Sequence, residues 1–354
     1  MTDESLQRSY PRMGGPGGVW AQRAESLVGK TIGERYRIVS FIGGGAVSTV
    51  FKAKDLSTAR TVALKIMPEC RSASAEALKI FEHGARLTIN HPNLVVVHAC
   101  GLTDDGAPWL AMEYLEDATS LAQLLKQEQK LTLDRVVSLF QKICDALAYI
   151  HTKGEVHFNV KPTNIMIMRR EGEGDQVKIA DFGIGKISLE REMEIYDDRL
   201  PRYSSALYMS PEQFQGQRIH AQSDVYSIGC MLYEALSGKP PLVGLTLLDT
   251  MDRHLREPPV PIQDAAPHVP PRLANVVMRC LHKEPARRYR TAEELRAALD
   301  KVFNPGDPSS VILPSVPQGT QLARKEHPLF YVTFLLSAVL LIITLVIAVT
   351  MALQ

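Results

Sequence analysis

The chain has 354 residues, of which 45% are hydrophobic and 22% charged, so it supports a packed core and is not disordered throughout. Its 40 basic and 39 acidic side chains leave a net charge of +1, which gives no electrostatic reason to expect a nucleic-acid partner. The five cysteines have no paired spacing, so we expect neither disulfides nor a zinc site, and a reducing compartment for the bulk of the chain.

The predicted elements change in character along the chain. Residues 1–33 hold the stretch MGGPGGV, and we expect a flexible segment there. Further on, short runs rich in β-formers predict strands at 35–43, 48–54, 61–67, 94–100 and 109–114, with one helix at 74–89. Beyond residue 119 the period becomes helical and predicts helices at 135–154, 223–237, 246–256, 271–282 and 292–302, besides short apolar runs at 164–168 and 177–180. This order predicts an α+β protein with a small β-rich lobe and a larger helical lobe.

The C-terminal part predicts a linker and a membrane segment. Residues 304–327 hold four prolines without a clear period, which is typical of a linker. Residues 329–353 form an uncharged run that, as a helix of ~1.5 Å per residue, covers about 37 Å and crosses a ~30 Å hydrocarbon layer. We therefore expect a single C-terminal transmembrane helix within 328–354; the alternative is a wholly buried soluble helix.

The flanks of this segment predict its orientation. Arg324 and Lys325 precede it, so the positive-inside tendency places residues 1–327 in the cytoplasm. Only Gln354 follows it, and we expect no sensor domain outside the membrane. Small residues that share one helix face would allow a homodimer through the membrane helix, but small residues scattered in an anchor explain the same pattern; they are Thr333, Ser337, Thr344, Ala348 and Ala352.

Three short motifs carry chemistry. IGGGAVSTV at 42–50 lies between two predicted strands, and its glycines let the backbone approach a phosphate; alone it also describes a plain hairpin. Lys65 sits inside an apolar strand 17 residues before Glu82, and it either faces solvent or pairs with Glu82 across a cleft. Asp181 in ADFG follows Asn164 by 17 positions, and this pair of oxygen ligands suits Mg²⁺, although ADFG alone is equally a turn.

Together with HFNVKPTN at 157–164 and SPE at 210–212, these motifs resemble the eukaryotic-type (Hanks-type) serine/threonine protein kinases in order and spacing, in their bacterial style. The resemblance covers residues 34–303 and extends through Asp224 and Arg288. It implies a two-lobed protein-kinase-like fold, ATP and Mg²⁺ as cofactors, and a protein as substrate or regulatory partner.

The resemblance also implies roles for individual residues. Lys65 would hold the α- and β-phosphates and pair with Glu82, and Lys161 would neutralise the transferring γ-phosphoryl group. Asn164 and Asp181 would hold Mg²⁺. The loop over the phosphates would consist of Ile42, Gly43, Gly44, Gly45, Ala46, Val47, Ser48, Thr49 and Val50. The adenine pocket would be formed by Val50, Ala63, the gatekeeper Met112, Glu113, Leu115 and Met166. A buried ion pair that anchors the end of the activation segment would join Glu212 and Arg288.

The sequence departs from the family at three places. Ser48 replaces the third loop glycine, a small change. Phe158 replaces an Arg that usually binds a phosphate on the activation segment. Asn159 replaces the catalytic Asp, and an amide accepts a hydrogen bond but takes no proton at neutral pH. General-base help is worth about 10²–10⁴-fold, so we expect nucleotide binding to persist and phosphoryl transfer to be slow.

Two hypotheses follow from these departures. The first is a membrane-anchored pseudokinase that binds Mg-ATP and regulates or recruits other proteins in signalling. The second is a slow but genuine serine/threonine kinase, which the surviving hydroxyl of Ser205 favours. We favour the first. A small-molecule phosphotransferase fits less well, because SPE and the long segment 184–209 are typical of a protein-substrate platform.

Overall fold

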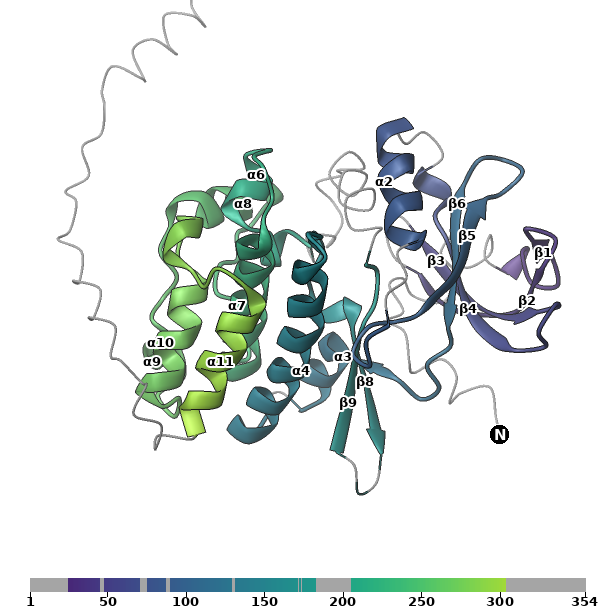
Figure 1. The fold of residues 1–354 in the computed structure, drawn as a ribbon. Coiled ribbons are helices and arrows are strands. Elements are labelled where there is room, and N and C mark those ends of the chain that lie inside the picture. The colour runs from purple at the N-terminus through teal and green to yellow at the C-terminus, as the bar shows by residue number, and fades with distance from the viewer. Residues whose placement is uncertain are drawn as a thin grey trace, which may run out of the picture. The chain divides into compact units, whose positions relative to one another are not determined.

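The computed structural model of the protein describes residues 25–44, 48–70, 75–86, 90–128, 131–170, 172, 174–182 and 205–303. The chain divides into two compact units, residues 1–305 and 306–354, and all the described residues belong to the first. In this unit a β-rich lobe is followed along the chain by a helical lobe, and the two lie side by side (Figure 1). The predicted two-lobed α+β fold is therefore confirmed.

The β-rich lobe is a six-stranded antiparallel sheet in the order β1–β2–β3–β4–β6–β5. Its strands are β1 (Thr31–Ile32), β2 (Tyr36–Gly44), β3 (Thr49–Asp55), β4 (Thr61–Ile66), β5 (Val97–Leu102) and β6 (Pro108–Glu113). Four predicted strands are confirmed to within one residue at each end. The fifth, predicted at 94–100, begins only at Val97, because Leu94 instead makes an isolated bridge to Ile179 of the helical lobe.

The first residues of the sheet lie within the segment predicted to be flexible. The Gly29 N–H donates to the Ile38 carbonyl, and the Ile38 N–H donates to the Lys30 carbonyl, both at 2.9 Å. These bonds extend toward the N-terminus the pairing of β1 with β2, in which Thr31 lies opposite Arg37 and Ile32 opposite Tyr36. A two-residue strand is too short to show a period in the sequence, which is why the prediction missed it.

The register of the sheet separates its two faces. Residues paired directly across antiparallel strands point to the same side. Val50 pairs with Lys65, and Ala63 pairs with Met112, so these four predicted site residues share one face. The opposite face carries an apolar cluster that includes Tyr36, Ile38, Phe51, Ala53, Val62, Leu64, Ile66, Trp109 and Ala111. Burial of that cluster holds the site face in place.

One helix, α2 (Ala75–Arg86), packs on the sheet and confirms the helix predicted at 74–89. Leu78, Phe81 and Ala85 recur at helical spacing and lie in one cluster with Met67, Cys70 and Leu110. Glu82 follows Phe81 directly and lies on the exposed side of the helix.

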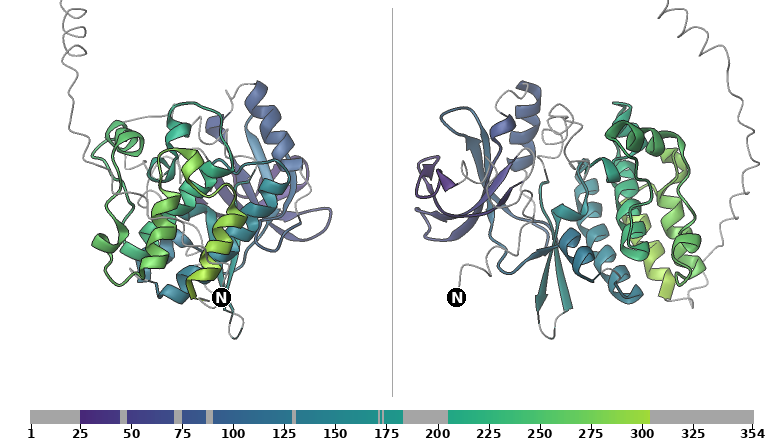
Figure 2. Two further views of the ribbon diagram at one scale, coloured as in Figure 1. Left: turned by 60° about the vertical axis from the view of Figure 1, so that its left-hand side comes forward. Right: turned by 180° about the vertical axis from the view of Figure 1, so that it is seen from behind.

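The helical lobe contains α3 (Leu121–Glu128), α4 (Leu133–Thr152), α6 (Pro211–Phe214), α7 (Ala221–Ser237), α8 (Leu247–Arg256), α9 (Ile262–Ala265), α10 (Pro271–Cys280) and α11 (Ala292–Phe303). The five predicted helices correspond to α4, α7, α8, α10 and α11, each within two residues at its ends. α7 is buried over nearly its whole length, and α4, α10 and α11 pack with it into one core (Figure 2). The short helices α3, α6 and α9 were not predicted.

A second sheet carries the site residues of the helical lobe. It pairs β7 (Thr119–Ser120), β8 (Ile165–Arg170) and β9 (Gly174–Ile179) in that order. β8 begins directly after Asn164, and β9 ends two residues before Asp181. The Ala180 N–H donates to the Asn164 carbonyl at 2.8 Å, so the two predicted metal ligands are held side by side by the backbone.

The linker predicted at 304–327 and the transmembrane helix predicted within 328–354 lie outside the described residues. Of the helices in the described part of the chain, none combines the length and the apolar character needed to cross a membrane.

Candidate active site

Residues 156–164 form the loop that carries Asn159, and Asp224 of α7 fixes its backbone. The buried Asp224 carboxylate accepts hydrogen bonds from the N–H of His157 at 3.0 Å and of Phe158 at 3.3 Å. The Nε2 atom of His151 on α4 lies 2.9 Å from the same carboxylate. Bonds to a buried carboxylate are stronger than neutral ones, so this acid holds the loop against the helical core.

Phe158 has a left-handed backbone, with φ at 68°. This conformation costs a residue with a Cβ atom about 1–2 kcal/mol, so the surroundings must enforce it. The Phe158 carbonyl accepts a hydrogen bond from the Gln213 Nε2 atom at 2.8 Å, while its N–H is held by Asp224. The turn just before Asn159 is therefore fixed on both sides.

His157 links this loop to the end of β9. Its Nε2 atom lies 3.0 Å from the Ala180 carbonyl, so Nε2 carries the proton and donates. Its Nδ1 atom accepts from the Asn159 N–H at 3.3 Å. Burial lowers the pKa of His157, which keeps the ring neutral and preserves this donor–acceptor pattern.

Asn159 and Asn164 are both buried and are joined by a hydrogen bond. The Asn164 Nδ2 atom donates to the Asn159 carbonyl at 2.8 Å. This bond fixes the orientation of the Asn164 amide, because its nitrogen is committed and its Oδ1 atom is left available to a cation. The carboxylate of Asp181 is the neighbouring oxygen ligand.

This ligand set fits magnesium better than a metal held only by protein groups. The described residues contain no cluster of three or more His, Cys, Asp or Glu side chains that could hold a metal ion. Mg²⁺ is usually held by one or two protein oxygens, with water and phosphate oxygens as its other ligands. Asn164 and Asp181 meet that requirement.

Lys65 is paired with Asp181. Its Nζ atom lies 2.6 Å from Asp181 Oδ2, and the two side chains are only 7% and 13% exposed. Burial acts to raise the pKa of the Asp181 carboxyl, but the ammonium groups of Lys65 and Lys161 outweigh it and hold that pKa below its ordinary value. Asp181 is therefore ionised at neutral pH. Its backbone is also left-handed, with φ at 67°.

The predicted pair of Lys65 with Glu82 is not among the ion pairs of the described residues, and Asp181 is the partner instead. Glu82 lies on the exposed side of α2, whereas Lys65 is 6% exposed. A buried ammonium is stabilised by a carboxylate that is buried with it. The spacing of the motifs made both Glu82 and Asp181 candidate site residues but could not show which of the two carboxylates pairs with Lys65.

Lys161 contacts Ser205. Its Nζ atom donates to Ser205 Oγ at 2.5 Å, and both side chains are buried. Ser205 follows the segment 183–204, which lies outside the described residues. The contact brings the lysine predicted for the γ-phosphoryl group to the hydroxyl that the sequence singled out.

The predicted adenine-pocket residues come from both lobes. Ala63 and Met112 lie on β4 and β6, and Leu115 and Met166 pack together in one apolar cluster with Ala118. In the predicted phosphate loop, residues 42–44 belong to β2 and residues 49 and 50 to β3, Ser48 precedes β3, and residues 45–47 lie outside the described part.

One site contact escaped the sequence analysis. The Glu113 carboxylate accepts from Lys178 Nζ at 2.6 Å and from the Val96 N–H at 2.8 Å. The bond to Lys178 ties β6 to β9 of the helical lobe. The signal was present, because Lys178 alternates with the apolar Val177 and Ile179, but no local pattern indicated its partner.

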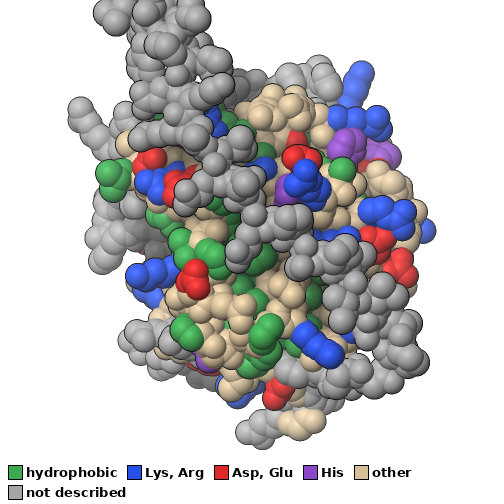
Figure 3. Space-filling view, turned by 90° about the vertical axis from the view of Figure 1, so that its left-hand side faces the viewer, with side chains coloured by type: hydrophobic (Ala, Val, Ile, Leu, Met, Phe, Trp, Pro, Cys, Tyr) green, Lys and Arg blue, Asp and Glu red, His purple; other side chains and the backbone are tan. Residues whose placement is uncertain are grey.

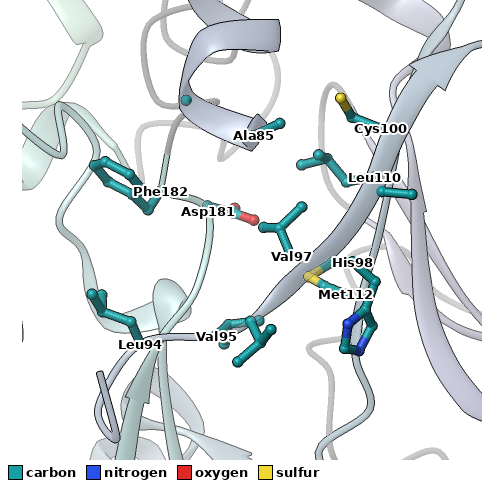
Figure 4. A pocket seen from close by; sticks show the side chains of 13 residues that line it. Ala85, Leu94, Val95, Val97, His98, Cys100, Leu110, Met112, Asp181 and Phe182 are labelled. Atoms are coloured by element: carbon teal, nitrogen blue, oxygen red, sulfur yellow. The ribbon is translucent and has the colours of Figure 1, made fainter. Parts of the chain in front are cut away.

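A cavity of about 340 Å³ lies behind Met112 (Figure 4). α2 contributes Gly84 and Ala85 to it, and the end of β9 leads into Asp181 and Phe182 on its other side. The remaining wall is built by Leu94, Val95, Val96, Val97, His98, Ala99, Cys100, Leu110 and Met112. Open space therefore separates α2 from Asp181, the acidic partner of Lys65.

The two-lobed fold, together with a buried Lys–Asp pair and the loop that carries Lys161 and Asn164, defines a protein-kinase-like domain. The model of the protein kinase domain family matches residues 36–299, and the chain belongs to this family.

Relatives and solved structures agree with this assignment. The chain is 34% identical over 288 residues to serine/threonine-protein kinase pkn3 of Myxococcus xanthus, covering 78% of this chain and 52% of that protein. It is 34% identical over 282 residues to PknB of Mycobacterium tuberculosis, covering 78% and 44%. The chain thus spans about half the length of these relatives. The PknI kinase domain of M. tuberculosis has the same fold, with a TM-score of 0.62 at 24% identity over 77% of this chain and 98% of that one.

Proposed function

We propose that the cleft binds Mg-ATP and that Asn159 makes phosphoryl transfer slow or absent, so that the chain works mainly as a nucleotide-binding pseudokinase in signalling. Protein kinases in general use ATP and Mg²⁺. The observation that carries the proposal is the buried Lys65–Asp181 pair next to Asn164, because both charges have a natural partner in a magnesium–phosphate complex.

Binding would exchange one set of partners for another. The Lys65 ammonium would move from Asp181 to phosphate oxygens, and Asp181 with Asn164 Oδ1 would turn to the metal. Mg²⁺, when bound, supplies positive charge that neutralises the phosphate oxygens. Lys161 stands ready for the transferring group, since its ammonium is already buried beside Ser205.

Asn159 limits the chemistry. Its carbonyl oxygen, the acceptor for Asn164 Nδ2, keeps the loop in shape, but its side-chain amide takes no proton from an incoming hydroxyl. Phosphoryl transfer depends chiefly on positioning and charge neutralisation, which the other residues supply. We therefore expect a loss of about 10²–10⁴-fold, not a complete loss of chemistry.

A slow serine/threonine kinase is the second candidate, and the Lys161–Ser205 hydrogen bond favours it. Both residues of this contact are present, although a protein that transfers no phosphoryl group needs neither of them. The two candidates differ only in whether the residual transfer is measurable.

The experiment incubates the full-length chain with γ-labelled ATP, Mg²⁺ and generic protein substrates, beside Asn159→Asp and Lys65→Ala. Transfer by the native chain below the detection limit, with a thermal shift on adding Mg-ATP, is the result that the pseudokinase proposal expects. Transfer by the native chain that disappears in Lys65→Ala establishes the slow kinase instead. A native chain without any thermal shift contradicts both.

We also propose that residues 329–353 anchor the chain in a membrane, with the kinase domain in the cytoplasm. The support is the uncharged length of the run and the basic residues before it. Fractionation in alkaline carbonate should leave the full chain in the membrane pellet and release a variant that lacks 329–353. A full chain that washes off would contradict the anchor.

A further inference from the structure

Positive charge is concentrated in the first strands of the β-rich lobe. Residues 28–61 hold six basic and two acidic side chains, a net charge of +4, although the whole chain has a net charge of +1. One of the two acids, Asp55, is bound by Arg35 through bonds of 2.8 and 2.7 Å. Within this stretch of sequence, Glu34 alone remains to balance the five other basic side chains.

Four strands bring part of this charge into one row across the sheet. Arg37 of β2 lies directly opposite Lys54 of β3, and the two are flanked by Thr31 of β1 and Thr61 of β4. Residues paired in this way point to the same side of a sheet, and all four side chains are exposed. The row, which we call the cationic row, therefore presents two cations and two hydroxyl groups to its surroundings.

The charge of these strands is not compensated within the described part of the chain. None of the exposed Lys30, Arg37, Lys54 and Arg60 has an acidic partner there at ion-pair distance. On the face of the helical lobe that Figure 3 shows, by contrast, Lys and Arg side chains lie beside Asp and Glu side chains. Several exposed arginines of that lobe are bound to an acid on the same helix or just before it, namely Arg256 to Asp252, Arg290 to Glu294 and Arg296 to Asp300.

Exposed apolar side chains accompany the cationic row. Val39 follows Arg37 by two residues, at a shift in the register of β2 and β3, and is 51% exposed. Leu56 follows Lys54 by two residues and is 54% exposed, while its N–H donates to the Arg35 carbonyl at 2.9 Å. Cations next to exposed apolar side chains suit the boundary of a bilayer, where phosphate groups lie beside the ends of the acyl chains.

We propose that the cationic row docks on the anionic headgroups of the membrane in which residues 329–353 lie. This inference rests on the proposed membrane anchor. Residues 304–328 connect α11 to the anchor, and a flexible chain of that length spans about 25–30 Å on average. Such a tether holds a domain at an effective concentration in the mM range, so a surface of modest affinity is enough for docking.

The attraction should be electrostatic in origin. Each Lys or Arg close to an anionic leaflet strengthens binding about five-fold at physiological salt. The hydroxyl groups of Thr31 and Thr61 can donate hydrogen bonds to phosphate oxygens on either side of the two cations. The attraction is screened by salt and should be lost at about 1 M, where the Debye length is ~3 Å.

Lysine labelling of the full-length chain tests the docking. The chain is reconstituted, without nucleotide, at one copy per nanodisc of phosphatidylcholine with or without about 30% phosphatidylglycerol. Acetylation of Lys54 by a water-soluble reagent, followed by mass spectrometry, should be at least about five-fold slower in the anionic discs. The exposed Lys239 of the helical lobe should be labelled at the same rate in both kinds of disc. The protection of Lys54 should disappear at about 1 M salt.

Charge reversal locates the surface. Arg37→Glu combined with Arg60→Glu keeps the Lys54 reporter and should return its labelling in anionic discs to within about two-fold of the rate in phosphatidylcholine. Arg218→Glu combined with Arg272→Glu makes the same change at two exposed arginines of the helical lobe and should leave Lys54 protected. Loss of protection in both double variants would mean that the net charge of the chain, not the cationic row, holds it on the membrane.

The outcomes separate this inference from the proposals on which it rests. A chain that does not copurify with the discs would overturn the anchor and the docking together. A chain that copurifies but labels Lys54 equally in both lipids would overturn the docking alone. Protection that follows the protein concentration, and not the lipid charge, would assign the cationic row to a second copy of the chain instead. The proposed binding of Mg-ATP is unaffected by any of these results, because no nucleotide is present.

Discussion

Two buried ion pairs, Glu212–Arg288 within the helical lobe and Lys65–Asp181 between the two lobes, differ in how completely their groups are bonded. Arg288 holds Glu212 through two bonds, Nη1–Oε1 at 2.7 Å and Nη2–Oε2 at 2.9 Å, and the side chains are 0% and 4% exposed. The guanidinium also donates to the carbonyls of Gln222, His282 and Lys283. The predicted Glu212–Arg288 pair is thus confirmed.

Lys65 and Asp181 have a simpler arrangement. One bond of 2.6 Å joins them, and Asp181 lines a cavity. A fully bonded pair cannot exchange partners without leaving a charge bare, whereas a singly bonded pair beside open space can. The difference teaches that burial alone does not make an ion pair structural: the first pair fixes the helical lobe, and the second is available to a ligand.

The largest expected effect tests whether Lys65 and Asp181 still take part in phosphoryl transfer. Asn159→Asp supplies the missing proton acceptor and should raise phosphoryl transfer by about 10²–10⁴-fold, equivalent to about 2.7–5.5 kcal/mol in the barrier. Labelled-phosphate transfer to a generic protein measures it. The gain should vanish in the double variant with Lys65→Ala; a gain that survives there would mean that Lys65 is not in use.

Breaking the Glu212–Arg288 pair should lower the free energy of unfolding. Arg288→Met leaves the Glu212 carboxylate without its main partner in the core and should lower the free energy of unfolding by about 3–5 kcal/mol. Denaturant unfolding measures this. Arg290→Met is the matched control, because Arg290 is 81% exposed in its ion pair with Glu294 and should cost less than about 1 kcal/mol. Equal costs would refute the distinction.

The stability of the core around the Glu212–Arg288 pair should depend on pH through His254. The Tyr226 ring lies beneath the Arg288 guanidinium, and the Tyr226 hydroxyl lies 2.9 Å from His254 Nδ1. Burial, with help from the Lys283 ammonium, lowers the pKa of His254 to about 3 from an ordinary 6.5. The unfolded chain therefore binds the proton first, and stability falls as the pH drops from about 6.5 toward 3, by up to about 1.4 kcal/mol per pH unit.

His254→Gln should reduce this slope, to which the buried His157 also contributes. Unfolding is best compared between pH 6.5 and 5, above the range in which ordinary carboxylates titrate. A variant with the native slope in that interval would show that another group is responsible.

The smallest expected effect comes from breaking the Lys65–Asp181 pair. Lys65→Met should lower the free energy of unfolding by less than Arg288→Met does, without nucleotide, because the Asp181 carboxylate keeps the Lys161 charge near it and a cavity beside it. Thermal denaturation measures this, with the exposed Lys54→Met on β3 as the control. A loss as large as that of Arg288→Met would make Lys65–Asp181 structural as well.

The sequence by itself determined most of the elements. Alternating or helical periodicity reports which side of a strand or helix is buried, so β2, β3, β4, β6 and the long helices were predicted closely. Their motifs also placed Lys65, Asn159, Lys161, Asn164 and Asp181 in one family pattern, which the family match to residues 36–299 supports. Elements too short to show a period, such as β1 and β7, were missed.

The tertiary structure decided the pairing of charges. The sequence predicted Glu82 as the partner of Lys65, whereas in the structure Lys65 pairs with Asp181. Likewise, Lys178 pairs with Glu113 and His83 with Glu155. Each of these pairs joins residues at least 65 positions apart. A periodic pattern records which side of an element is buried, whereas the partner of a charge depends on how separate elements pack, and that information is absent from any local stretch of sequence.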